Sequence, residues 1–356
     1  MPTPYRAAAA AFASRVTESD LPVLRRLNAS QRRDFALDLC ALLDFATPGG
    51  EPVSGSPPPN AGGLRAAVMI DHVPGMTSRA ACALVDRLSL ASRRSVPDVR
   101  NLRVFEVHDV VIIAHAPRLR DELLGWRGSA STRRRRLVDV LPAAEPAMRA
   151  ALVADALARA AGALEGEGGE GGEGGEESEA GRDDARDEQK QSRPRDLVAA
   201  LGALADAVPP PTLVGACLGY PRVYSWSKAG DVAAAARALS SETLRVYEVY
   251  ARFRGVEKNG TQKRAYAAAT RRVCGFTVPA REAWEEGAGS RNEASPSSES
   301  RSNRLEAEDE DEAVTSVDGD ARAWLEAMRE RAAAGGDVWT DLELRVETRG
   351  AGPVAL

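Results

Sequence analysis

The chain has few of the residues that usually carry covalent chemistry or metal binding. Its 356 residues include four cysteines and three histidines, and aromatic residues make up 5%. The cysteines lie far apart, with no Cys-x-x-Cys pair and no histidine at the spacing of a metal site. This pattern argues against structural zinc and against a disulfide framework. It indicates reduced, mostly buried thiols in a cytosol-like compartment.

Catalytic signatures are also lacking. The sequence has no Gly-x-Ser-x-Gly elbow, and no cysteine has a neighbouring histidine. No motif therefore indicates hydrolysis by a serine or cysteine nucleophile. A glycine-rich phosphate loop and a dinucleotide-binding motif are missing too. The sequence therefore leaves open whether the protein is an enzyme, and it identifies no cofactor.

No apolar run is long enough to cross a bilayer, and the formal net charge is -5. An acidic chain has no general attraction to polyanions, so neither a membrane nor nucleic acid is an expected partner. We expect a cytoplasmic protein. Arg6 and Arg15 in the alanine-rich N-terminal segment leave organelle import as a minor alternative, although Glu18 and Asp20 favour an ordinary surface helix.

Short apolar runs alternate with helical patterns along the chain. Residues 66–70 and 110–114 are continuous apolar runs, residues 137–141 repeat the pattern around Asp139, and each is followed by a segment of helical periodicity. Strands buried on both faces have this appearance, and strand–helix alternation is typical of parallel sheets. The sequence predicts an α/β fold with a mainly parallel or mixed sheet flanked by helices. Charged residues alternating with apolar ones predict an antiparallel edge strand at 342–346.

We expect a single domain over residues 1–356, interrupted by low-complexity segments. Residues 47–62 are rich in proline and glycine and predict an exposed connector. Residues 165–195 are rich in glycine and glutamate, and residues 286–318 are serine-rich and then acidic. Such segments have too few apolar side chains to offset the entropy of ordering, so both are predicted to be disordered inserts.

The first apolar run leads into candidate ligand-binding residues. Asp71 and His72 follow the predicted strand, and Thr77 begins the next helix after a Pro-Gly turn. A carboxylate at a strand end can orient a hydroxyl group, bind magnesium or act as a base, and a helix start can bind phosphate. Capping of the turn and the helix is the structural alternative for Asp71 and Thr77. His72 and His115 could add metal ligands beside Asp71, but their scattered spacing does not predict a metal site.

A second candidate region surrounds Gly219. Tyr220, Tyr224 and Trp226 place three large amphipathic rings near one turn in a chain that has few aromatic residues. Such rings can line a ligand pocket or a protein interface, and they can equally pack in the core.

Three segments resemble an uncharacterised eukaryotic family typified by a chromosome-1 open-reading-frame protein. They are LVGACLGYPRVYSW at residues 213–226, VCGFTVPAREAW at residues 273–284 and PVAL at residues 353–356. The first strand with Asp71 is similar as well. In that family a cysteine follows the aspartate, where this chain has His72, which weakens metal or thiol chemistry there. The family has no established activity, so the resemblance implies no catalytic residue.

Two functions follow from these observations. The first is binding of a small polar or phosphorylated ligand at the carboxyl ends of the strands, with Asp71, His72 and Thr77 opposite Tyr220 and Tyr224. The second is a non-catalytic adaptor or protein-interaction scaffold, which fits the missing catalytic signatures. A small molecule and a protein are therefore the possible partners.

Overall fold

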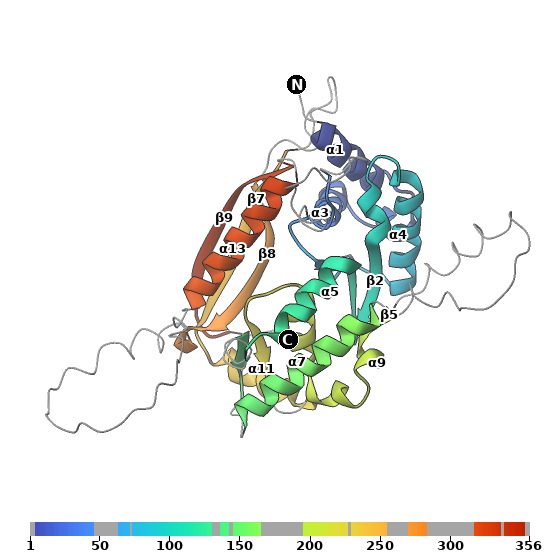
Figure 1. The fold of residues 1–356 in the computed structure, drawn as a ribbon. Helices are drawn as coiled ribbons and strands as arrows, with labels where there is room; N and C mark the ends of the chain where they lie inside the picture. Colours follow the sequence, from blue (N-terminus) through green and yellow to red (C-terminus); the bar gives the residue numbers. More distant parts are fainter. Residues whose placement is uncertain are drawn as a thin grey trace, which may run out of the picture.

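The structure is a computed structural model that describes residues 4–45, 63–71, 73–129, 136–141, 145–164, 195–226, 229–254, 270–282, 317–335 and 338–352. Within these ranges helices surround three small sheets of four, two and three strands (Figure 1). The mixed helix and strand content agrees with the predicted class. The predicted parallel arrangement is wrong, because most strand pairs are antiparallel.

The first sheet has the strand order β1-β3-β2-β5. Its strands are β1 (Ala67–Met69), β2 (Leu102–Val107), β3 (Val110–His115) and β5 (Arg195–Asp196). β3 runs antiparallel to both β1 and β2, and only the two-residue β5 pairs in parallel.

The turn between β2 and β3 explains the antiparallel pairing. Only His108 and Asp109 separate the two strands, and His108 has a φ of 52°. A two-residue loop can join only antiparallel neighbours, because a parallel pair needs a long crossover. The continuous apolar runs have another origin: Val104 and Ile113 face one hydrophobic cluster, whereas Phe105 and Ile112 face another. An antiparallel sheet that is covered on both faces has the same sequence pattern as a parallel one.

The second sheet keeps part of the predicted arrangement. It pairs β4 (Leu137–Asp139) with β6 (Val223–Ser225) in parallel. Trp226 follows β6 and is fully buried in a small cluster with Val140, Leu239 and Leu244.

The third sheet, here called sheet C, has the order β8-β7-β9 and is entirely antiparallel. Its strands are β7 (Leu244–Phe253), β8 (Thr270–Pro279) and β9 (Trp339–Arg349). Helix α13 (Val317–Ala334) covers one face of it, and β9 lies at the outer edge (Figure 1). The antiparallel edge strand predicted at 342–346 is therefore present as part of β9.

N-terminal helices close the largest hydrophobic cluster, which also contains side chains of sheet C and α13. Asn28 and Gln31 form a reciprocal capping box at the start of α3, which fixes where this helix begins. The described helices are α1 (Pro4–Thr17), α2 (Pro22–Arg25), α3 (Ala29–Cys40), α4 (Ser78–Ser92), α5 (Ala116–Leu124), α7 (Pro146–Ala163), α9 (Leu197–Leu201), α10 (Pro210–Cys217), α11 (Val232–Ser240) and α13, with 3-10 turns η1 (Pro97–Asn101), η2 (Gly125–Arg127), η3 (Gly202–Ala207) and η4 (Ala229–Asp231).

The predicted connector at 47–62 lies outside the described residues, and so do nearly all of the predicted inserts at 165–195 and 286–318. The described ends of these inserts are ordered, since residue 195 belongs to β5 and residues 317–318 begin α13. In the part of the chain that the structure describes, no helix has the length and apolar character needed to span a membrane.

Candidate functional site

Two predicted ligand residues lie at the end of β1 and the start of α4. Asp71 follows β1 and is exposed. Thr77 is also exposed, and its hydroxyl oxygen accepts a hydrogen bond from the Ala80 backbone nitrogen at 3.2 Å. The Thr77 side chain therefore caps α4. His72 lies outside the described residues.

The two predicted tyrosines have different neighbours. The Tyr220 ring packs against Phe276 and Trp324, with centroid separations of 6.2 Å and 6.1 Å. The Tyr224 hydroxyl lies 2.6 Å from the Thr277 Oγ1 atom on β8. Burial raises the pKa of Tyr224 to about 12, although the hydrogen bond to Thr277 acts in the opposite direction. Both rings therefore contribute to packing against sheet C.

Asp71 and Tyr220 nevertheless lie close enough to interact electrostatically. Burial raises the pKa of Tyr220, the charges of Arg65 and Arg272 lower it, and the Asp71 charge adds to the increase. The Asp71 charge is the weakest of these influences on Tyr220. The Tyr224 hydroxyl is bonded to Thr277, and the Thr77 hydroxyl is bonded within its own helix.

His115 lies at the other end of β1 from Asp71. The register pairs Ala67 with Ala114, and the His115 backbone nitrogen donates to the Ala66 carbonyl at 2.9 Å. A parallel pairing would have placed both side chains at one edge of the sheet, and the antiparallel pairing separates them. Among the described residues, no group of three or more His, Cys, Asp or Glu side chains is arranged to hold a metal ion.

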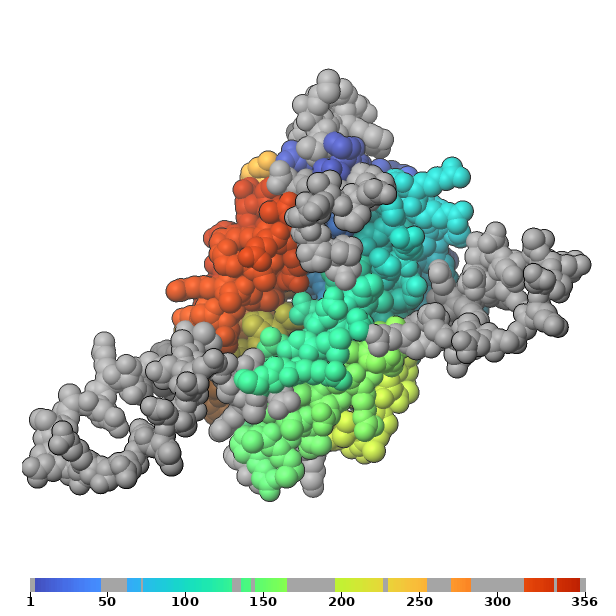
Figure 2. Space-filling view, in the orientation of Figure 1, coloured from blue at the N-terminus to red at the C-terminus, as the bar shows by residue number. Residues whose placement is uncertain are grey.

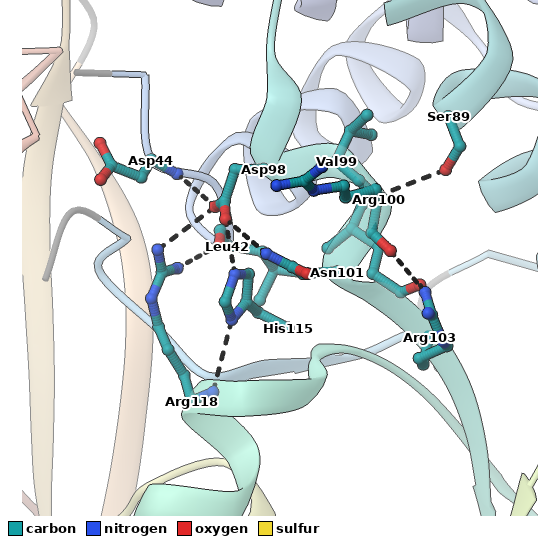
Figure 3. Close-up of polar contacts among 11 residues, drawn as sticks. Leu42, Asp44, Ser89, Asp98, Val99, Arg100, Asn101, Arg103, His115 and Arg118 are labelled. Carbon is teal, nitrogen blue, oxygen red and sulfur yellow. Dashed lines mark hydrogen bonds and ion pairs between the residues drawn. The ribbon is translucent and has the colours of Figure 1, made fainter. Parts of the chain in front are cut away.

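His115 instead belongs to a buried polar network centred on Asp98 (Figure 3). The His115 Nε2 atom lies 2.7 Å from Asp98 Oδ1, and the Arg118 guanidinium lies 3.3 Å from Asp98 Oδ2. The Asp44 backbone nitrogen and the Asn101 side-chain amide also donate to this carboxylate, at 2.8 Å and 3.0 Å. One carboxylate thus joins four segments of the chain.

Each ring nitrogen of His115 has a partner within the protein. The Nδ1 atom accepts from the Arg118 backbone nitrogen at 3.4 Å, and the Nε2 atom is hydrogen-bonded to Asp98. Burial alone would raise the pKa of Asp98, but the His115 hydrogen bond and the Arg118 charge hold it below its ordinary value. Both ring nitrogens of His115 are used within the protein, and the side chain is fully buried. We therefore interpret this network as a structural joint rather than as an acid–base pair.

All four cysteines are free and buried. Burial is the main reason why the pKa of each thiol is raised, to about 11 for Cys82 and Cys274 and to about 12 for Cys217, with Cys40 shifted in the same direction. Because the thiolate is the nucleophilic form, these side chains are poorly suited to covalent catalysis. The buried thiols match the sequence prediction.

A small hollow lies between α4 and β2 and has a volume of about 10 Å³, roughly the space of one water molecule. Its lining residues are Cys82, Val85, Asp86, Leu102, Arg103 and Val104. The hollow is too small for an organic ligand.

The face of sheet C opposite α13 carries a row of polar side chains that crosses all three strands. On β7, Glu248 accepts from Arg272 of β8 at 2.8 Å and from the Tyr250 hydroxyl at 3.0 Å. The Arg345 guanidinium of β9 lies 4.2 Å from the centre of the Tyr250 ring and 3.1 Å from Glu343. The side chains at both ends are open to solvent: Arg272 is 62% exposed, Arg345 47% and Glu343 56%. We call these five residues the sheet C row.

Glu248 anchors the sheet C row from a buried position. The residue is only 5% exposed, and the Arg272 hydrogen bond, assisted by Tyr250, lowers its pKa although burial acts against this. The row is not evident from the sequence. Its residues come from three strands whose pairing is not evident from sequence spacing, and only the alternation of charged residues along β9 could have drawn attention to it.

Comparison with known proteins gives no match to a family model, to a curated protein or to a solved structure. The resemblance to the chromosome-1 open-reading-frame family therefore stays a prediction.

Proposed function

We propose that this chain is a non-catalytic protein-interaction scaffold whose partner binds the open face of sheet C. The observation that carries this proposal is the sheet C row, in which a buried glutamate holds a mixed-charge surface across three strands. Arginine and tyrosine are the residue types that interfaces favour, and paired charges hold their side chains in fixed positions for a partner. Trp226 was an expected partner residue, but it is fully buried and has no part in this proposal.

The experiment neutralises the exposed charges without removing the hydrogen-bond donors. Arg272→Gln and Arg345→Gln keep an amide beside Glu248 and Tyr250, and Arg94→Gln changes an exposed arginine at the end of α4 as the matched control. The full chain is used to isolate a stoichiometric partner, and its Kd for each variant is measured. We expect the two sheet C variants to weaken binding by about tenfold or more and the control to leave it unchanged. Equal affinities for all three variants would contradict the proposal.

Ligand binding at the end of β1 is the second candidate function, because Asp71 and Tyr220 lie within electrostatic reach of each other. Nucleotides, sugar phosphates and divalent cations are the probes. A compound at about 100 times its Kd should stabilise the fold by about 2.7 kcal/mol, which a thermal-shift assay detects. The response should disappear in Asp71→Ala and persist in Asp109→Ala, which changes an exposed aspartate in the β2–β3 turn. If no compound raises the melting temperature, the ligand function is ruled out for these classes.

A further inference from the structure

The outer edge of β9 is the most open part of sheet C. Residues 343–349 are exposed apart from the half-buried Leu344, and Val346 is 42% exposed. Among the described strands, β9 pairs with β7 alone. In Figure 2 the red C-terminal segment forms one flank of the molecule. A strand with one unpaired edge offers a row of backbone donors and acceptors to another strand.

The usable part of this edge has defined limits. The β7–β9 register shifts between Tyr250 and Arg252, and Asp341 has a φ of 53°. The Leu342 carbonyl accepts a hydrogen bond from Arg329 of α13 at 2.9 Å. Regular pairing with another strand therefore begins at Glu343, and β9 ends at Arg349.

The charges along this stretch alternate in sign on one face of the strand. Glu343, Arg345, Glu347 and Arg349 follow at every second residue, and the structure records the neighbouring pairs 343–345 and 347–349 at 3.1 Å and 3.6 Å. Edge charges of one sign would repel an identical strand. Alternating charges can attract one, provided that the register is correct.

We propose that β9 pairs with β9 of a second copy of this chain, antiparallel and across a two-fold axis at Val346. This inference goes beyond the proposed scaffold function, because the partner in that function binds the open face of sheet C, whereas the second copy pairs with the edge of β9.

In the proposed register, residues equally far from position 346 face each other. Glu343 then faces Arg349, and Arg345 faces Glu347, so all four charges meet an opposite charge. On the other strand face Val346 meets its own copy, which covers the exposed apolar side chain. The two three-stranded sheets become one continuous six-stranded sheet with an isologous interface.

Neighbouring registers are excluded by the same charges. An axis at residue 345 makes Arg345 face itself and Glu343 face Glu347. With an axis at residue 347, Glu347 faces itself and Arg345 faces Arg349. Since like charges directly opposite each other destabilise a strand pair, only the register centred on Val346 satisfies the whole row.

The test uses two charge swaps in the full-length chain. The first swap is Glu343→Arg with Arg345→Glu, and the second is Glu347→Arg with Arg349→Glu. Each swap keeps the net charge of the chain and keeps opposite charges within the pairs 343–345 and 347–349 of one strand. Across the two-fold axis, however, it places like charges opposite each other, at 343 and 349 and at 345 and 347. In an equimolar mixture of the two swaps, every glutamate again faces an arginine.

Sedimentation velocity over micromolar to submillimolar concentrations measures the outcome. We expect the mass of the wild-type chain to rise from 37.8 kDa towards twice that value, each swap alone to stay monomeric, and the mixture to recover the dimer. A wild-type chain that stays monomeric, swaps that dimerise as well as the wild type, or a mixture of folded swaps that stays monomeric would overturn the inference.

A second measurement covers the case in which a swap fails to fold, which circular dichroism detects. Amide hydrogen exchange in β9 of the wild-type chain should slow as its concentration rises, and concentration-independent exchange would contradict the dimer. Failure of the dimer is distinguishable from failure of the scaffold function. A monomeric chain whose stoichiometric partner still depends on Arg272 refutes only the dimer.

Discussion

The His115 Nε2 atom and the Asp98 Oδ1 atom lie 2.7 Å apart, although the two residues are 17 positions apart in the sequence. Asp98 belongs to η1, before β2, and His115 ends β3. The Asp98 carboxylate also accepts a hydrogen bond from the Asp44 backbone nitrogen, which lies in the segment after α3. This contact therefore ties the N-terminal helices to the first sheet.

Removing the charge of Asp98 should destabilise the protein strongly. Asp98→Asn removes the carboxylate charge that lies 3.3 Å from the buried Arg118 guanidinium and places an amide donor beside two other donors. Breaking a buried charge pair typically costs about 3–5 kcal/mol, and we expect a loss of this size in urea unfolding. Asp109→Asn, in the exposed β2–β3 turn, is the matched control and should change stability by less than about 0.5 kcal/mol. Similar losses in the free energy of unfolding for the two variants would contradict the prediction, because the Asp98 network would then stabilise the fold no more than an exposed charge does.

Stability should depend on pH in the acid range. The pKa of Asp98 and that of Glu248 are both lower in the folded protein than their ordinary values. Their contribution is therefore fully present above the unfolded-state pKa of about 4 and is lost as the pH falls through the folded-state values. Urea unfolding between pH 7 and about pH 5 should give nearly constant free energies, with a decrease below about pH 4. Equal free energies of unfolding above and below about pH 4 would contradict the lowered pKa values of Asp98 and Glu248.

The Tyr224–Thr277 hydrogen bond should be measurable by a double-mutant cycle. Tyr224→Phe and Thr277→Val each remove one partner of the 2.6 Å contact between β6 and β8. Each single change should cost about 1 kcal/mol, and the double variant should cost clearly less than the sum, because the contact can be lost only once. Additive losses in thermal or urea unfolding would mean that the two hydroxyls do not interact.

Gly219 and Gly162 should respond oppositely to alanine. Gly219 has a φ of 69°, and an added Cβ atom would lie 3.3 Å from the Glu122 carboxyl carbon, so Gly219→Ala should destabilise the fold by about 1–2 kcal/mol. Gly162 lies in α7 with nothing near its Cβ position, so Gly162→Ala should stabilise the fold by up to about 1 kcal/mol. Calorimetry of both variants checks the two signs. A loss of stability in both would contradict this interpretation of the backbone.

The positions of the strands were largely predictable from the sequence. The runs at 66–70, 110–114 and 137–141 correspond to β1, β3 and β4. Short apolar runs rich in β-branched residues are recognisable because a half-buried or buried strand needs them locally.

The pairing of the strands was not predictable, because it depends on contacts that are distant in sequence. The two-residue turn at His108 and Asp109 is the strongest local sign of antiparallel pairing. The continuous apolar runs favour a parallel sheet instead, and the sequence prediction follows them. Burial on both faces explains those runs without a parallel sheet, since hydrophobic clusters cover both sides of β2 and β3.

The candidate site was predictable only in part. The apolar strand correctly placed Asp71 at the exposed end of β1, whereas a shared site of Asp71 and Tyr220 stays a prediction. The Asp98 network and the sheet C row were missed, because each joins residues from at least three elements whose meeting depends on the tertiary fold.

The central strand of sheet C has a consequence for synthesis. β7 ends at Phe253, whereas its partner β9 begins only at Trp339. During translation β7 and β8 are synthesised before β9, so the edge of β7 that β9 occupies stays unpaired until residues 339–349 have left the ribosome. Chaperones should therefore be needed to protect the unpaired edge of β7 in nascent chains. Termination of synthesis before β9 should yield an aggregation-prone product.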